Sequence, residues 1–321
     1  MELLKNIGLC VLGVALLYFG AEYLIRGGVA IARKLGVSPL LIGLTLVAFG
    51  TSAPELVVSI QAALNNSGDI AVGNVIGSNI CNIALILGLC AALQPIATNT
   101  KLFKLDMPLL LGASILFAVF YFCDGRGVNF WQGAVMFAIL LVYLGWSFYQ
   151  DKKSGGGELS AAAEEESGDD CKVWLAVIFV IGGLAGLVIG ARCFVSSAVF
   201  FARAMGVSQA VIGLTIVALG TSLPELATSV VAVIKGERDI AVGNVVGSNI
   251  FNILVIMGIA PMVSDLHAPN VSMIDMAVML ALVPVLWVMM ATGKRVSRLE
   301  GGVLLIVYCA YTAWLFFNGV A

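Results

Sequence analysis

The chain has 321 residues, of which 60% are hydrophobic and only 11% are charged, and its formal net charge is −2. Soluble domains carry about a quarter charged residues, so this composition excludes the two soluble domains that the length alone would suggest. Apolar runs of about 18 residues or more recur along the sequence, which predicts an all-α protein that crosses a membrane many times. The small net charge says little about partners, and we expect no nucleic acid among them.

Hydropathy predicts ten membrane spans, which cover residues 4–30, 38–64, 70–93, 107–122, 129–149, 173–201, 208–234, 240–262, 274–291 and 300–319. The segment after the fifth span is different because it contains a glycine run, 155–157, and an acidic run, 164–166. Such a composition is typical of a flexible, solvated linker. We therefore expect three parts, which are a five-helix repeat over 1–149, a cytoplasmic acidic and glycine-rich linker over 150–171, and a second five-helix repeat over 172–321.

The two halves are copies of each other. Residues 36–90 match residues 206–260 at 32 of 55 positions, with a constant offset of 170 and no gap. A match this dense indicates an internal duplication. Because each half contains an odd number of spans, the second half enters the membrane in the opposite sense to the first. The duplication thus predicts an inverted repeat, related by an axis in the membrane plane.

Basic residues predict how the chain is oriented, because cytoplasmic loops are enriched in lysine and arginine. With the N-terminus outside, twelve basic residues fall on the cytoplasmic side, which are Arg33, Lys34, Lys101, Lys104, Lys152, Lys153, Lys172, Lys235, Arg238, Lys294, Arg295 and Arg298. Only three fall outside, which are Lys5, Arg126 and Arg203. We therefore expect both termini to lie outside.

Each half carries a glutamate deep in an apolar span. Glu55 closes the run 43–55, and Glu225 closes the matching run 213–225. A carboxylate in hydrocarbon costs a few kcal/mol or more unless it is paired, and neither run contains Lys, Arg or His. We expect the missing positive charge to come from a bound cation or from protons. The alternative is a protonated glutamic acid used for packing, which the repetition of the feature disfavours.

The surroundings of both acids suit a hard cation. Hydroxyl groups flank each acid, and a preceding proline interrupts the helix, which would free backbone carbonyls as ligands. The candidate oxygens belong to Thr51, Ser52, Thr221 and Ser222, and to the carbonyls of Ala48 and Ala218. Calcium takes about six to eight oxygen ligands. Soft ligands are absent from these runs, which argues against copper, zinc or iron.

A second motif, Gly-Asn-x-x-Gly-Ser-Asn-Ile-x-Asn, also occurs once in each half. Its spacing places a serine and an asparagine one turn apart on the same helical face, Ser78 with Asn82 and Ser248 with Asn252. Polar side chains of this kind also form hydrogen bonds between membrane helices, which is the alternative interpretation. Their repetition next to an acidic motif favours a role as cation ligands.

Together, the paired Gly-Thr-Ser-x-Pro-Glu and Gly-Ser-Asn-x-x-Asn motifs resemble the α-repeats of the calcium/cation antiporter superfamily, most closely its prokaryotic sodium/calcium exchanger branch. The resemblance covers the whole chain. It implies that the four motif helices form an ion site and that the first and sixth spans slide across them. It also implies ligand roles for Ala48, Thr51, Ser52, Glu55, Ser78, Asn82, Ala218, Thr221, Ser222, Glu225, Ser248 and Asn252.

One position departs from the family pattern, because exchangers of this family carry an aspartate where this chain has Asn252. The site then contains two obvious carboxylates instead of three. This difference bears on how many ions are exchanged and on any coupling to potassium.

These observations predict a secondary active transporter that exchanges Na⁺ for Ca²⁺ by alternating access, with three sodium ions per calcium ion. We expect it in the plasma (inner) membrane of a prokaryote, acting as a monomer in the lipid bilayer, without a cofactor and without enzymatic activity. An H⁺/Ca²⁺ or K⁺-linked antiporter of the same fold is the nearest alternative. A passive cation channel is a more remote one.

Overall fold

The computed structural model describes residues 2–153, 172–206 and 218–318, which are mostly helical. The first half contains α1 (Glu2–Leu35), α2 (Pro39–Ile42), η1 (Gly43–Val47), α3 (Ala48–Thr51), α4 (Ala53–Leu64), α5 (Gly68–Ile80), η2 (Cys81–Leu87), α6 (Gly88–Leu93), β1 (Ile96–Ala97), η3 (Leu102–Asp106), α7 (Met107–Cys123), β2 (Gly127–Val128) and α8 (Phe130–Lys153). The second half contains α10 (Val173–Ala204), α12 (Ala218–Gly220), α13 (Leu223–Lys235), α14 (Arg238–Phe251), η5 (Asn252–Ile256), α15 (Met257–Val263), β3 (Leu266–His267), α16 (Met273–Gly293), β4 (Arg295–Val296) and α17 (Arg298–Asn318). The segments labelled η are π-helical turns.

The described part of the chain contains eight helices that are long and apolar enough to cross a membrane, and a bent pair, Pro39–Thr51 with Ala53–Leu64, makes a ninth candidate span. The expected span 208–234 extends into residues 207–217, which lie outside the described residues, so the count of ten stays a prediction. The largest boundary differences are at the end of the first span, observed at Leu35 instead of 30, and at the start of the fourth, observed at Leu102 instead of 107. The fourth span begins earlier because the π-helical turn η3 precedes α7.

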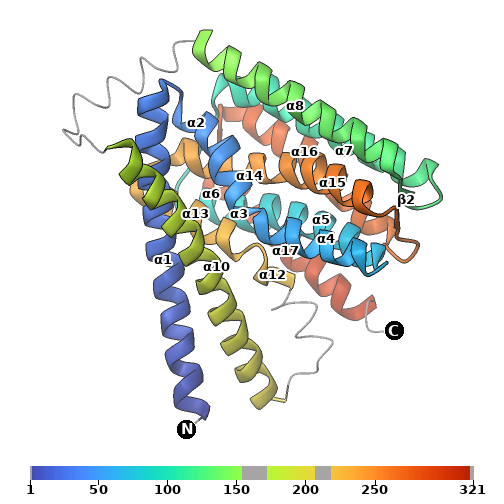
Figure 1. The fold of residues 1–321 in the computed structure, drawn as a ribbon, viewed down its shortest axis with the longest axis horizontal. Helices are drawn as coiled ribbons and strands as arrows, with labels where there is room; N and C mark the ends of the chain where they lie inside the picture. Colours follow the sequence, from blue (N-terminus) through green and yellow to red (C-terminus); the bar gives the residue numbers. More distant parts are fainter. Residues whose placement is uncertain (1, 154–171, 207–217, 319–321) are drawn as a thin grey trace.

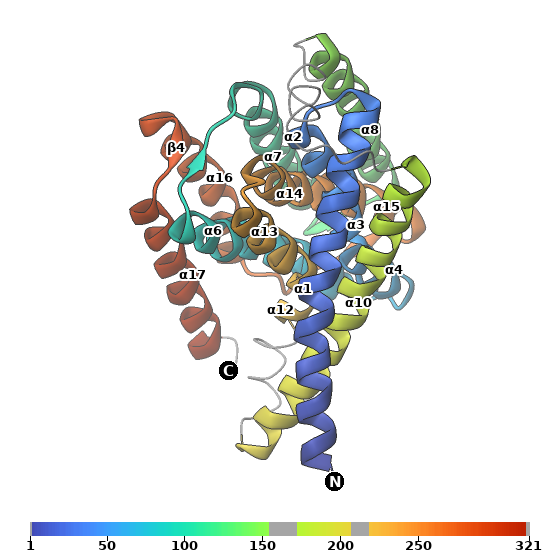
Figure 2. The ribbon, with the colours of Figure 1, turned by 90° about the vertical axis from the view of Figure 1, so that its left-hand side faces the viewer.

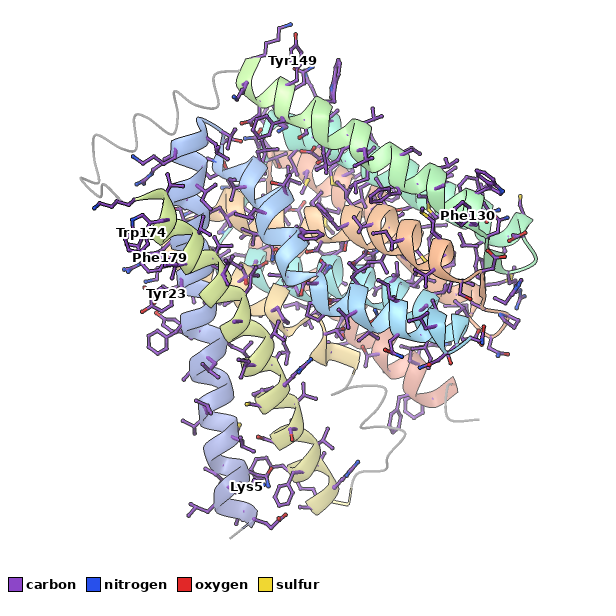
Figure 3. The ribbon with its side chains drawn as sticks, viewed as in Figure 1. Lys5, Tyr23, Phe130, Tyr149, Trp174 and Phe179 are labelled. Atoms are coloured by element: carbon purple, nitrogen blue, oxygen red, sulfur yellow. The ribbon has the colours of Figure 1, made fainter. Side chains whose placement is uncertain are left out.

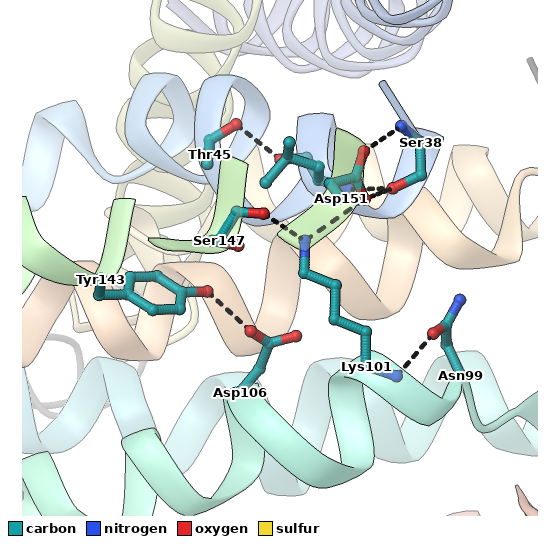
Figure 4. A network of polar contacts seen from close by, with 9 residues as sticks. Ser38, Thr45, Asn99, Lys101, Asp106, Tyr143, Ser147 and Asp151 are labelled. Atoms are coloured by element: carbon teal, nitrogen blue, oxygen red, sulfur yellow. Dashed lines mark hydrogen bonds and ion pairs between the residues drawn. The ribbon is translucent and has the colours of Figure 1, made fainter. Parts of the chain in front are cut away.

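The fifth span continues past its expected end, since α8 reaches Lys153 and the first residues of the expected linker 150–171 are therefore helical. The rest of that linker, 154–171, lies outside the described residues. The carboxylate of Asp151 accepts hydrogen bonds from the backbone N–H of Ser38 (2.7 Å) and from its hydroxyl (2.6 Å), and Lys101 Nζ lies 3.4 Å away (Figure 4). These contacts tie the last turn of α8 to the start of α2.

Two continuous helices form the centre of the molecule. In the span made of α5, η2 and α6, 78% of the most apolar window is buried, and in the span made of α14, η5 and α15 all of it is, against 11% to 44% in the other unbroken spans. Figure 1 shows α14 and α15 running through the middle of the molecule. Each of these two central spans contains one copy of the motif Gly-Asn-x-x-Gly-Ser-Asn-Ile-x-Asn.

Helices α1 and α10 lie side by side and project beyond the rest of the molecule (Figures 1 and 2). They run antiparallel, because Gly13 contacts Gly190 while Gly20 contacts Gly183. A Cβ atom at Gly183 would lie 2.6 Å from the backbone nitrogen of Leu24, so only glycine permits this approach. At the repeat offset of 170, Gly183 and Gly190 are the equivalents of Gly13 and Gly20. The same contact is therefore made twice with the repeats exchanged, as a local two-fold relation requires.

Two short antiparallel ribbons join loops of opposite halves. β1 pairs with β4, with Ile96 opposite Val296, and β2 pairs with β3, with Val128 opposite Leu266. Ile96 and Leu266 are equivalent at the offset of 170. Each half thus contributes one strand to each ribbon. The two halves therefore contact each other through these loops as well as through their helices.

The outer surface carries large apolar side chains. Trp174 and Tyr149 are 60% and 58% exposed and lie at the end of the molecule opposite Lys5 (Figure 3). The rings of Tyr23 and Phe179 contact each other across α1 and α10, with 5.4 Å between their centroids. Exposed apolar and aromatic side chains on long apolar helices are typical of a surface that faces lipid.

The α1–α10 contact can be tested with two neighbouring glycines. Gly183→Val places a side chain where backbone atoms already lie, whereas Gly182 has no atom within 4 Å of an added Cβ. We expect Gly183→Val to destabilise the purified protein by about 1–3 kcal/mol, as overpacking does, and to lower its melting temperature in detergent. Gly182→Val adds the same volume and should leave the melting temperature unchanged. Equal effects of the two variants would contradict this packing.

Candidate cation site

The two buried glutamates come from different repeats and lie next to each other. Glu55 and Glu225 are each 1% exposed. The hydroxyl of Ser222 donates to Glu55 Oε1 (3.3 Å), and the hydroxyl of Ser52 donates to Glu225 Oε1 (2.9 Å). Each acid is thus held by the serine of the opposite repeat, so the two carboxylates form one site.

Local sequence explains why each acid stands where it does. A proline at the first helical turn, Pro54 in α4 and Pro224 in α13, separates each of these helices from the one before it. In the first repeat the resulting bend is 46°. Ser52 and the equivalent serine of the second repeat have nearly the same backbone angles, φ −82° and ψ 3° against φ −88° and ψ 5°. The acids then occupy the first turn of a helix, where the helix dipole favours a negative charge.

The serines of the second motif complete this group. Ser78 lies 3.4 Å from the hydroxyl of Ser222, and Ser248 donates to Glu225 Oε1 over 3.5 Å. One helical turn further on, Asn82 and Asn252 are both 1% exposed. The central spans therefore bring their serines to this group, and the two asparagines follow one turn further along.

The threonines and alanines differ between the repeats. Thr51 Oγ1 donates to Asn244 Oδ1 (3.1 Å), whereas the hydroxyl of Thr221 has no partner among the described residues. The carbonyl of Ala48 is not freed by the helix interruption, because it accepts from Ser52 N (3.0 Å) and lies 3.3 Å from Thr51 Oγ1. The expectation of a free carbonyl there is therefore not met. Ala218 begins the short helix α12, and its ligand role stays a prediction.

Sequence reasoning missed a second layer of polar residues that holds the acids in place. Asn74 Nδ2 donates to the carbonyl of Glu55 (3.3 Å) and to the hydroxyl of Ser59 (3.0 Å). Its repeat equivalent Asn244 makes the same two contacts, with Glu225 O (3.3 Å) and Ser229 Oγ (2.9 Å). The signal that could have found these residues is their identity in both repeats at the offset of 170.

Several oxygens at this site have no hydrogen-bond partner within the described residues, which are Glu55 Oε2, Glu225 Oε2, Asn82 Oδ1, Asn252 Oδ1 and Thr221 Oγ1. All are buried oxygen atoms that can accept a hydrogen bond, and a hard cation binds such oxygens. In the part of the chain that the structure describes, neither glutamate forms an ion pair, and no third His, Cys, Asp or Glu joins them in a metal-ligating group. Further ligands would therefore be neutral oxygens.

The family model of the sodium/calcium exchanger proteins matches residues 5–149 and 175–317 of this chain. The chain belongs to the sodium/calcium exchanger family. The resemblance expected from the paired motifs is thereby confirmed, and with it a multi-pass membrane protein of the prokaryotic calcium/cation antiporter type.

Several known proteins are similar to this chain over nearly their whole length. The putative antiporter CaxA of Alkalimonas amylolytica is 41% identical over 315 residues, which cover 95% of this chain and 96% of CaxA. The sodium/calcium exchanger MaX1 of Methanosarcina acetivorans is 34% identical over 97% of this chain and 99% of its own length. The inner membrane protein YrbG of Escherichia coli is 35% identical over 96% of both chains.

A solved structure of the sodium-calcium exchanger NCX_Mj, soaked with zero Na⁺ and Ca²⁺, superposes with a TM-score of 0.82 at 34% identity. It covers 98% of this chain and 99% of NCX_Mj. The helical membrane-type fold is therefore that of an exchanger of known structure.

Cation binding at this site of the exchanger can be tested on the purified protein. A ligand at about a hundred times its dissociation constant stabilises the folded state by about 2.7 kcal/mol, so calcium should raise the melting temperature. Glu55→Gln and Glu225→Gln should each abolish that rise, because they remove one of the two carboxylates. Asp275→Asn is the matched control, since Asp275 is an acid on another span that accepts from Tyr311 (2.8 Å). A full calcium-dependent rise in either glutamine variant would contradict a cation site here.

Proposed function

We propose that this chain is a secondary active transporter that exchanges Na⁺ for Ca²⁺ by alternating access. The observation that carries the proposal is the pair of buried glutamates, one from each repeat, each with an oxygen that has no hydrogen-bond partner among the described residues. Membership of the exchanger family supports the class of transport. The printed names of MaX1 and NCX_Mj, both sodium/calcium exchangers, support the choice of ions.

The two-fold relation between the repeats supports alternating access. A pair of inverted repeats can adopt two conformations in which each repeat takes the role of the other, so a site at their interface opens to one side and then to the other. The reciprocal, antiparallel packing of α1 against α10 is what such a relation requires. In our proposal the chain has ten spans with both termini outside, and α1 and α10 slide together across the central helices.

Free energy favours three sodium ions per calcium ion. Extruding calcium against a roughly 10⁴-fold gradient needs about 5.6 kcal/mol, at about 1.4 kcal/mol per tenfold. Two sodium ions entering down a tenfold gradient supply about 2.8 kcal/mol and move no net charge. Three supply about 4.2 kcal/mol, and the extra charge adds about 2.3 kcal/mol per 100 mV. Two glutamates neutralise one calcium ion or two sodium ions, so the third sodium ion would bind neutral oxygens.

Tracer flux separates this function from its alternatives. Proteoliposomes loaded with sodium should take up radioactive calcium from a sodium-free medium, and an inside-positive potential should accelerate uptake because net positive charge leaves. Glu225→Gln should reduce uptake to the level of empty liposomes, whereas Asp275→Asn should retain it. A pH gradient in place of the sodium gradient tests the H⁺/Ca²⁺ antiporter, and added potassium tests a K⁺-linked one. Uptake without any counter-ion, accompanied by unitary currents, would instead indicate a channel.

The orientation can be tested with one native cysteine. Cys123 ends α7 and is exposed. In a variant that lacks the other six cysteines, a membrane-impermeant maleimide should label Cys123 in intact spheroplasts, because this loop is predicted to lie outside. Lys152→Cys at the exposed end of α8, in a background without Cys123, should be labelled only after permeabilisation. The reverse pattern would contradict the proposed orientation in a prokaryotic inner membrane.

A further inference from the structure

Four asparagine side chains at the end of the second motif form hydrogen bonds between the two repeats. Asn82 Nδ2 donates to Asn249 Oδ1 (3.0 Å), and Asn252 Nδ2 donates to Asn79 Oδ1 (3.2 Å). The repeat offset of 170 turns Asn82 into Asn252 and Asn79 into Asn249. The two hydrogen bonds are therefore one contact made twice, with the repeats exchanged. All four side chains are at most 2% exposed.

These bonds decide which end of each amide faces the site. A primary amide has its oxygen and its nitrogen on opposite sides, so an Asn82 that donates from Nδ2 to Asn249 must direct Oδ1 elsewhere. The oxygens of Asn82 and Asn252 have no partner among the described residues, although both are buried. A contact that served packing alone would leave two buried acceptors unpaired, which is unfavourable.

The outer pair is itself held in one orientation. Asn79 Nδ2 contacts the sulfur of Met279 (3.7 Å), and Asn249 Nδ2 donates to the carbonyl of Asn79 (3.5 Å). With their amino groups engaged, Asn79 and Asn249 present oxygens to the inner pair. An oxygen that already faces position 252 accepts from an amide but would repel a carboxylate. The amide of Asn252 fits this oxygen as a hydrogen-bond donor.

We propose that Asn79 and Asn249 are positioning residues, which hold the amide oxygens of Asn252 and Asn82 as ligands for the transported cations and thereby set the affinity for sodium. The inference rests on the proposed exchange of sodium for calcium. Sodium is the ion affected most because the two glutamates already balance the charge of calcium, whereas a third sodium ion depends on neutral oxygens. Neither Asn79 nor Asn249 touches the ion in this arrangement.

A double-mutant cycle tests the proposal through the sodium and calcium concentrations that half-saturate exchange in proteoliposomes. Asn79→Ala should raise the half-saturating sodium concentration about fivefold, the effect of one hydrogen bond, and change that of calcium by less than about twofold. In a background of Asn252→Ala, the Asn79→Ala change should have no further effect, because Asn79 acts through Asn252. The matched control combines Asn79→Ala with Asn82→Ala, for which the two effects should multiply.

Either of two outcomes would overturn the inference. One is that the effects of Asn79→Ala and Asn252→Ala multiply, and the other is that Asn79→Ala lowers the affinities for sodium and calcium equally. If Asn79→Ala does not fold, the mirror cycle of Asn249→Ala with Asn82→Ala decides the question. If the wild-type protein shows no sodium-driven calcium uptake, that result contradicts the proposed function but not the positioning role. The same cycle is then read from the sodium-dependent rise in melting temperature, and the absence of any such rise in the wild type would overturn the positioning role as well.

Discussion

Two carboxylates buried side by side, without an ion pair to any basic side chain of the described residues, impose the main constraint on this molecule. Charges removed from water are tolerated only when they are paired or satisfied by hydrogen bonds. Here the protein supplies hydroxyl donors from Ser52 and Ser222 to one oxygen of each acid, and no described residue bonds the other oxygen of either acid. The remaining stabilisation has to come from bound cations or from protons. In the proposed function, binding of the transported ions meets the same electrostatic requirement that governs the fold around Glu55 and Glu225.

The duplication places one such acid in each repeat and joins the two acids in one site. Each acid is bonded by the serine of the other repeat, and each inner asparagine by the outer asparagine of the other repeat. The α1–α10 glycine contact and the two short ribbons follow the same reciprocal pattern. A site assembled in this way cannot form within one repeat, because each acid and each inner asparagine is bonded by a residue of the opposite one. It also lies where a relative movement of the repeats would change its access to either side.

The repeats are not identical at every position, and some contacts occur in only one of them. Glu22 of α1 forms an ion pair with Lys235 of α13 (3.0 Å) and lies 3.6 Å from Arg26. The equivalent of Glu22 in the second repeat is Arg192, so the same pair is not available when the repeats exchange roles. The carbonyl of Ala48 likewise accepts the amide of Ser52, whereas the amide of Ser222 bonds Leu219. A transporter with an internal two-fold relation can prefer one conformation only through such asymmetries.

The amino-acid sequence alone was sufficient for the features that depend on local composition and spacing. It predicted a polytopic helical membrane protein, the duplication, the positions of most spans, the two glutamates that meet, and the family. These follow because hydropathy, periodicity and a repeated motif are properties of short stretches of chain. Only the tertiary structure decided which serine bonds which acid, that the carbonyl of Ala48 stays occupied, that Lys235 reaches Glu22, and that Asn79 and Asn249 orient the inner asparagines. Each of these joins residues far apart in the chain, so it depends on how closely the helices approach one another and in which direction they run, and no local pattern specifies that.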